Sequence, residues 1–263
     1  MRTYTKESLI ETLRGICNQG WIPNARHGNV GGVGNTLEDL LGITENNLPI
    51  PNANEWELKC QRGQTTSLTT LFHMEPSPRA LHFVPAVFLL KYGWRHEEAG
   101  GRYPPTEMSF RQTIHGLSRS DRGFGVVIDA VARKVLISFD PSTVGLRHAE
   151  WLESVRQRVG TLGELNPQPY WGFDDLYAKA RTKLTNCFYV RADVRREADG
   201  TESYKYRDIL MCEGFSLEKF LIALQNGNAL VDFDARTGHN HGTKFRLRQD
   251  KLPELYAAIT KIT

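Results

Sequence analysis

The sequence has few cysteines and no paired cysteine motif, and this limits the kinds of site that it can hold. Its four cysteines are far apart and form no C-x-x-C pair, so neither a zinc knuckle nor a disulfide framework is expected. No apolar run approaches the roughly 18 residues needed to span a bilayer, and the N-terminus has no long apolar core. We therefore expect a cytoplasmic protein with reduced, buried thiols and no membrane partner.

Strong net charge and internal repeats are also missing. Lys plus Arg number 33 against 30 Asp plus Glu, so the net charge of +3 does not by itself indicate an anionic partner. The 40% hydrophobic and 24% charged residues are typical of a soluble globular protein. No repeat or low-complexity linker divides the 263 residues, so we expect one compact body with two lobes.

A glycine-rich stretch, HGNVGGVGNT at 27–36, lacks the pattern of a phosphate-binding loop. The Lys-Ser/Thr pair that completes such a loop is missing, and no strong strand precedes the glycines. We expect a turn where backbone approaches a partner closely, followed by a short helix that is capped by Thr36. Glu38 lies off the leucine stripe of that helix.

The alternating segment EWELKC at 55–60 predicts a strand with one ionic and one apolar face. Glu57 and Lys59 share the first face, and Trp56 and Leu58 share the second. A glutamate and the Leu58 carbonyl could supply oxygen ligands to a hard cation such as Mg²⁺, and the lysine could orient an attacking water. Taken alone, the E-x-K pattern also arises on any exposed strand with alternating charges.

The segment from Ala235 to Lys251 has five basic residues and two histidines against one acidic residue, a local field suited to phosphates. His239 and His241 alternate along an extended stretch, and Arg246 follows on a strand. An H-x-H pair can chelate a metal, but no third histidine or cysteine lies nearby. His and Arg also donate to guanine N7 and O6, while an ordinary solvated face is the simpler alternative.

Periodicity predicts helices and strands through much of the chain. Thr5 begins an amphipathic helix, and the segment after Asp250 is expected to form a terminal helix. The stretch FGVVIDAVARKVLISFD at 124–140 predicts two strands joined by a turn. This mixture of elements indicates an α/β or α+β fold.

Three stretches together resemble the MvaI/BcnI family of type II restriction endonucleases, relatives of the MutH nickase within the PD-(D/E)XK nucleases. The first covers residues 20–76, from GWIPN to HMEP. The second is YWGFDDL at 170–176, and the third is GHNHGTKFRL at 238–247. The resemblance implies a mixed-sheet, MutH-like PD-(D/E)XK core. It further implies a single endonuclease domain over 1–263, with two lobes around a DNA cleft. Catalytic motifs would lie at about 20–76 and recognition residues at about 168–255.

The resemblance also implies roles for single residues. Catalysis is expected of Glu38, Asn52, Glu57 and Lys59, and Mg²⁺ would be held by Asn52, Glu57 and the carbonyl of Leu58. Contacts to DNA are expected from His73, Arg236, His239, His241, Lys244 and Arg246.

Asn52 departs from the family pattern, which has aspartate at this position. The amide keeps the shape but removes the negative charge that binds the cation. Glu55 is nearby but an uncertain substitute, because it is two residues from Glu57 and displaced by about 6 to 7 Å along an ideal strand. We favour an engineered Asp-to-Asn change made to hold uncleaved DNA over a natural variant.

The activity that the resemblance implies is Mg²⁺-dependent cleavage of double-stranded DNA by a monomer that nicks the two strands in turn. His73 matches BcnI-like members and the HNHGT loop is closer to MvaI-like ones, so both CC-S-GG and CC-W-GG remain open as targets. A cognate DNA methyltransferase is the expected partner in the same system. The alternatives are a sequence-specific DNA-binding protein without catalysis and a MutH-like repair nickase.

Overall fold

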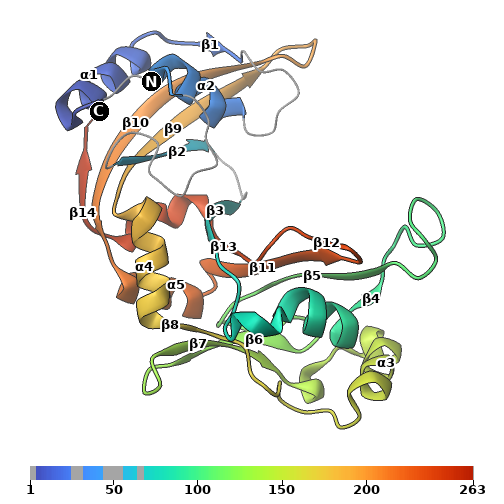
Figure 1. Ribbon diagram of the computed structural model, residues 1–263. Helices are drawn as coiled ribbons and strands as arrows, with labels where there is room; N and C mark the ends of the chain where they lie inside the picture. The colour runs from blue at the N-terminus through green and yellow to red at the C-terminus, as the bar shows by residue number, and fades with distance from the viewer. Residues whose placement is uncertain (1–3, 25–31, 44–55, 64–67, 263) are drawn as a thin grey trace. The chain divides into compact units, whose positions relative to one another are not determined.

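The computed structural model describes residues 4–24, 32–43, 56–63 and 68–262, and the chain divides into two compact units (Figure 1). Unit 1 consists of residues 1–68, 178–216 and 248–263, and unit 2 of residues 69–177 and 217–247. Each unit is therefore assembled from segments that are far apart in the sequence.

Unit 1 is built on a mixed sheet. Among the described residues it has five strands, and β2 runs parallel to β9 while the other pairs are antiparallel. The order is β1-β10-β9-β2, with β14 also paired to β10. The strands are β1 (Ile22–Pro23), β10 (Glu202–Phe215), β9 (Asn186–Arg196), β2 (Trp56–Arg62) and β14 (Tyr256–Lys261).

Two helices, α1 (Lys6–Cys17) and α2 (Gly32–Leu41), cover the apolar face of this sheet. Thr5 caps α1 by accepting a hydrogen bond from the Ser8 amide, as predicted. The strands contribute alternate side chains to the shared core because successive residues of a strand face opposite sides. This core contains Leu9, Leu13, Leu37, Leu41, Trp56, Leu58, Phe188, Val190, Tyr206 and Ile209.

The start of α2 differs from the prediction. The helix begins at Gly32 rather than after Thr36, so Thr36 lies inside it and does not cap it. A Cβ at Gly32 would come within 2.8 Å of Asn24 Nδ2 and closer still to the Tyr204 hydroxyl, so the close approach requires glycine. The tight packing of Gly32 against Asn24 and Tyr204 thus fixes α2 beside β10.

The end of the chain also differs. The predicted terminal helix is wrong: Gln249–Leu255 is 3₁₀-helical, and the following residues form β14. Pro253 inside the turn lacks the amide that an α-helix would need there. β14 gains backbone pairing along β10, from Tyr256 opposite Phe215 to Lys261 opposite Leu210.

Unit 2 contains two antiparallel sheets. The larger has the order β3-β13-β11-β5-β4, with β12 also paired to β11, and the smaller has the order β6-β7-β8. The predicted pair of strands within 124–140 is confirmed as β6 and β7. The strands are β3 (Leu68–His73), β13 (Lys244–Arg248), β11 (Ala229–Arg236), β5 (Met108–Ile114), β4 (Trp94–Arg95), β12 (His239–Asn240), β6 (Phe124–Asp129), β7 (Lys134–Phe139) and β8 (Tyr170–Gly172).

A π-helix, η2 (Phe83–Tyr92), packs an aromatic cluster against the apolar face of the larger sheet. Phe88 is fully buried and stacks on Phe110 with ring centroids 4.9 Å apart, and its edge meets Phe233. The sequence pattern did not predict this helix or α3. The remaining helices are α3 (Ala149–Val159), α4 (Phe173–Leu184), α5 (Leu217–Gln225), and the 3₁₀ turns η1 (Arg79–Leu81), η3 (Pro141–Thr143), η4 (Leu146–His148) and η5 (Gln249–Leu255).

The predicted α+β class with a mixed sheet is confirmed. None of the helices in the described ranges is long and apolar enough to cross a membrane.

Candidate functional site

Strand β2 separates an ionic pair from the apolar core of unit 1. Trp56 and Leu58 point into the core, and Glu57 and Lys59 alternate to the other face, as the sequence predicted. Lys59 Nζ donates to Glu57 Oε1 at 2.6 Å. The carboxylate is only 2% exposed while the lysine is 21% exposed, so the pair is reached from the lysine side.

One oxygen of the Glu57 carboxylate has no hydrogen-bond partner within the described residues. This atom, Oε2, is buried. A buried carboxylate oxygen without a donor costs several kcal/mol, unless a cation or an ordered water compensates for the lost hydration. A hard divalent cation, which prefers carboxylate and carbonyl oxygens, fits this atom.

Further metal ligands from side chains are not gathered around Glu57 in the described ranges, where no group of three or more His, Cys, Asp or Glu residues could hold an ion. Asn52, the predicted ligand upstream, lies outside the described residues. The Leu58 side chain is buried in the core, so its carbonyl is the part of this residue that could serve a cation.

Neutral groups surround the buried end of Glu57. Cys187 is its register partner on β9, and Cys212 is in turn the partner of Cys187 on β10. Burial raises the pKa of the Cys187 thiol, and it raises the pKa of Cys212 to about 12. Burial also raises the pKa of the Tyr256 hydroxyl, which the charge of Glu57 raises further. These groups therefore stay uncharged near neutral pH and leave Lys59 as the cation hydrogen-bonded to the carboxylate.

Glu38 is carried by α2, which is fixed to unit 1 at both ends. The Tyr206 hydroxyl donates to Val33 O at 2.7 Å, and the Tyr4 hydroxyl donates to Leu41 O at 2.6 Å. Burial chiefly raises the pKa of the Cys60 thiol, and the charge of Glu38 adds to this effect.

The larger sheet of unit 2 has a polar face that gathers most of the predicted DNA-contacting residues. Register places Lys244 opposite Asp232, and Arg246 opposite Leu230, on the same face. Lys244 Nζ lies 3.5 Å from Asp234 Oδ2, and Arg246 Nη1 lies 3.3 Å from Asp232 Oδ2. Both predicted cations are therefore ion-paired and partly buried.

Asp234 is shared by several cations on this face. Arg111 Nε donates to its Oδ1 at 2.6 Å, and His241 Nε2 lies 4.0 Å from Oδ2. Desolvation opposes ionisation of the carboxyl, but the hydrogen bond and charge of Arg111, with Lys244 and His241, hold the pKa of Asp234 below its ordinary value. The carboxylate thus stays charged and holds these cations together.

The three predicted histidines lie beside this polar face. The rings of His239 and His241 meet edge to face, with centroids 4.2 Å apart. An ideal Cβ at Gly242 would lie 3.5 Å from His73 Cδ2, which places the end of β3 beside the histidine-bearing loop. Glu75 holds the same loop by accepting from the Thr243 amide at 2.9 Å.

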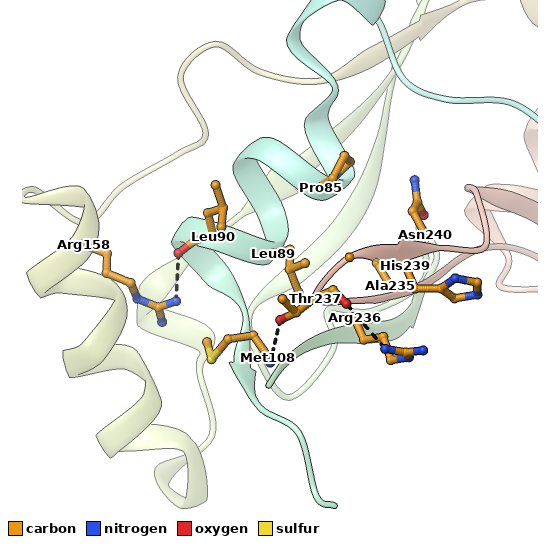
Figure 2. Close-up of a pocket in the computed structure, with 11 residues that line it drawn as sticks. Pro85, Leu89, Leu90, Met108, Arg158, Ala235, Arg236, Thr237, His239 and Asn240 are labelled. Atoms are coloured by element: carbon orange, nitrogen blue, oxygen red, sulfur yellow. Dashed lines mark hydrogen bonds between the residues drawn. The ribbon is translucent and has the colours of Figure 1, made fainter. Parts of the chain in front are cut away.

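Arg236 extends this set at the start of the turn that leads to His239. Its guanidinium donates to Glu107 Oε1 at 3.1 Å, and His239 is its register partner on β12. A pocket of about 550 Å³ lies beside this turn (Figure 2). Leu89 and Leu90 form its apolar side, and the Arg236 and His239 side chains extend away from them in Figure 2.

The carboxylates and the hydroxyl that organise these cations were not predicted from the sequence. In ALVDFDAR at 229–236, strict alternation places Asp232, Asp234 and Arg236 on one face, and this signal could have identified them. Arg111 and Thr113 on β5 could not be found in this way, because only the register with β11 brings them there. Thr113 donates to Asp232 at 2.9 Å.

Comparison with known proteins shows where this arrangement belongs. Residues 10–256 match the model of the MvaI/BcnI restriction endonuclease family. No curated protein sequence matches the chain.

Two solved structures have a similar fold. The structure titled "Restriction endonuclease MvaI-cognate DNA substrate complex" is 24% identical with a TM-score of 0.73, covering 99% of this chain and 100% of that one. The structure titled "Restriction endonuclease MvaI in the absence of DNA" is 24% identical with a TM-score of 0.56, covering 100% of both chains. These matches confirm the predicted restriction-endonuclease-like core. Since the family match extends over most of the sequence, the chain belongs to the MvaI/BcnI restriction endonuclease family.

Proposed function

We propose that the protein is a type II restriction endonuclease that binds double-stranded DNA and hydrolyses its phosphodiester bonds with Mg²⁺. The observation that carries this proposal is the buried Glu57 carboxylate, which is paired to Lys59 through one oxygen and has no partner in the described residues for the other. Family membership supplies the general activity, and the E-x-K strand gives it a chemical location.

Glu57, the Leu58 carbonyl and the side chain at position 52 would hold the cation. When bound, the cation stabilises the negative charge that develops on the phosphate and the leaving oxygen. Lys59 orients the attacking water or takes up its proton, because its amine lies at the exposed end of the pair. Glu38 contributes from α2 as a further acidic residue, as the family resemblance implies.

Recognition is proposed for the polar face of unit 2. Arg236, His239, His241 and Arg246, with His73 beside them, would donate to base edges, and Lys244 would contact a phosphate. The expected target is a CC-N-GG-type site, either CC-W-GG or CC-S-GG. With one catalytic centre in each chain, a monomer would nick the two strands in turn, and a cognate DNA methyltransferase would protect the host site.

A sequence-specific DNA-binding protein without catalysis is the second candidate, and Asn52 favours it. An amide cannot supply the charge that a cation needs, whereas the polar face of unit 2 does not depend on position 52. A nickase of the MutH type is a third candidate.

The test of catalysis is the substitution Asn52→Asp, because it restores the missing carboxylate. We expect Mg²⁺-dependent cleavage of plasmid DNA to rise by orders of magnitude, and Glu57→Gln in the same background to abolish it without unfolding the protein. Mapping the ends on DNA of known sequence would identify the site.

The outcomes separate the three candidates. Double-strand cuts at a CC-N-GG-type site support the endonuclease. If the Asn52→Asp protein binds specifically but cleaves no better than the unchanged protein, position 52 has no metal-binding role. That result would favour the DNA-binding protein without catalysis. Nicked circles that form only with a partner protein would favour the third.

A further inference from the structure

Gln61 is a third polar residue on the ionic face of β2, two positions beyond Lys59. Its side chain is buried, with 6% of the residue exposed, and its Oε1 has no hydrogen-bond partner in the described part of the chain. A buried amide oxygen without a partner costs about 1–3 kcal/mol, so a ligand or ordered water that satisfied the Gln61 amide would stabilise the folded protein. The ion pair of Glu57 with Lys59 does not use Gln61.

A polar pocket of about 700 Å³ lies beside Gln61 in unit 1. Gln61 and Arg191 are register partners in the parallel pair β2–β9, so their side chains line the pocket from neighbouring strands. Gly63, the next residue on the same face of the chain, adds no side chain to it. Trp21 closes another side of the pocket.

Two of the carboxylates that line the pocket are paired with cations other than Arg191. Asp193 is paired with Arg207 at 2.8 Å, and Asp208 is paired with Lys261 at 3.2 Å. Within the described residues Arg191 forms no ion pair with a carboxylate, and its guanidinium lies 5.7 Å from the centroid of the Tyr189 ring.

Asp250 is the remaining carboxylate of the pocket, and its charge would limit the affinity for a free anion. A phosphate that belongs to a larger bound molecule is less affected by the charge of Asp250, because other contacts already hold that molecule in place.

An arginine and a primary amide side by side present parallel N–H groups, which match the oxygens of a phosphate. Rotation about the terminal bond exchanges the amide oxygen with the NH₂ group, which would then donate from the position that Oε1 now occupies.

We propose that Gln61 and Arg191 bind one backbone phosphate of the DNA strand that lies over Glu57 and Lys59. The inference rests on the proposed function, since it requires DNA on this face of β2. Two strand positions separate Gln61 from Lys59 by about 6 to 7 Å, so the bound phosphate would be a neighbour of the one that is cut. Gln61 and Arg191 are positioning residues: they fix the strand, while Glu57 and Lys59 face the reacting atoms.

The test is a binding experiment that does not depend on cleavage. CC-W-GG and CC-S-GG duplexes are prepared with one neutral methylphosphonate at each backbone position in turn, and their affinities are measured without Mg²⁺. We expect one position next to the cut to lower the affinity of the unchanged protein about tenfold, because a hydrogen-bonded charge is removed. Arg191→Ala and Gln61→Ala should each be insensitive to the methylphosphonate at that same position.

Further variants refine the result. Arg191→Ala should also reduce the salt dependence of binding by about one phosphate contact. Arg191→Lys keeps the charge and should retain only part of the sensitivity to that methylphosphonate, which Arg191→Ala loses. Gln61→Glu keeps the shape and should weaken binding to the normal duplex but not to the methylphosphonate one. Arg14→Ala is the matched control, because Arg14 lies on α1, on the other face of the sheet, and donates to Ile262 O.

The outcomes are distinguishable. If no duplex is bound better than scrambled DNA, the proposed function fails and this inference with it. If specific binding is intact but the Gln61 and Arg191 variants keep the full sensitivity at every position, the proposed function stands and the phosphate site is wrong. Thermal unfolding of each variant shows whether it is folded, and Gln61→Glu and Arg191→Lys replace any alanine variant that is not.

Discussion

Asp232 and Asp234 determine how the cations on the polar face of unit 2 are presented. Arg246 is held by Asp232, and Arg111 and Lys244 are held by Asp234. A guanidinium that is anchored through one nitrogen keeps its plane fixed and has further N–H groups for a base edge. A fixed guanidinium plane favours discrimination between bases, whereas the Lys244 ammonium has no such plane and acts as a point charge that attracts phosphate.

Arg246 and Lys244 should therefore differ in what they contribute. We expect Arg246→Ala to reduce the difference in binding free energy between cognate and near-cognate DNA by about 1 to 3 kcal/mol, since the proposed bidentate contact to guanine would be lost. Lys244→Ala should instead lower the affinity for all DNA sequences by the same factor. Competition binding against a panel of single-base variants measures both effects.

Two further variants control this comparison. Asp232→Asn should show part of the Arg246 effect, because it releases the guanidinium. Arg102→Ala, in an arginine whose side chain is 70% exposed, should change neither affinity nor specificity. A uniform loss of affinity in Arg246→Ala would instead assign this face to phosphate binding.

At the scale of secondary structure, β2 could be predicted and its surroundings could not. Alternation within a few residues identifies both faces of a strand, and Glu57 and Lys59 lie as that pattern indicates. The packing of Gly32 on α2 depends on the space beside Tyr204, and β14 depends on the edge of β10; no local stretch of sequence contains either partner. The π-helix Phe83–Tyr92 is apolar on most sides, so helical periodicity has little signal there.

Glu202 accepts hydrogen bonds from Arg62 on β2, Arg196 on β9 and Tyr204 on β10. These bonds should make the free energy of unfolding depend on pH. Hydrogen bonds from Arg196 at 2.7 Å, Arg62 at 2.9 Å and Tyr204 at 2.9 Å lower the pKa of Glu202 to about 2. The Glu202 carboxylate therefore binds a proton more tightly in the unfolded chain than in the folded protein. Its stabilising contribution is complete above the ordinary glutamate pKa and is lost as the pH falls through about 2.

We expect Glu202→Gln to destabilise unit 1 by about 3 kcal/mol near pH 7, and the difference from the unchanged protein to shrink between about pH 5 and 2. Urea unfolding at a series of pH values measures this difference. Glu197→Gln, at an exposed ion pair with Arg195, serves as the control and should change little. A difference for Glu202→Gln that is independent of pH would show that the hydrogen bonds do not act through the charge.

For the whole molecule, net charge predicts little and the distribution of charge predicts more. The excess of three positive charges is small, yet the polar face of unit 2 gathers several cations around two carboxylates. The basic segment and the family could be predicted from the sequence, because both depend on residues that are close together in the chain. The pairing of Gln61 with Arg191 and of Arg111 with Asp234 required the folded sheets.

Binding should accordingly have two components with different salt dependence. We expect the protein to hold a CC-N-GG-type duplex far better than a scrambled one, and affinity for the scrambled duplex to fall steeply as salt is raised. Fluorescence anisotropy at several salt concentrations measures both. Equal affinity for the two duplexes at moderate salt would contradict sequence-specific binding.

The backbone passes between the two units after residues 68, 177, 216 and 247, and this sets the order in which they can be completed during synthesis. Unit 2 has all of its residues once 247 has left the ribosome, whereas unit 1 still needs 248–263, which include β14. The unit that carries Glu57 and Lys59 is therefore the last to be finished. A nascent chain would complete the unit of the proposed recognition surface before the unit of the proposed cutting centre, and neither unit could be transferred to another protein as one uninterrupted piece of gene.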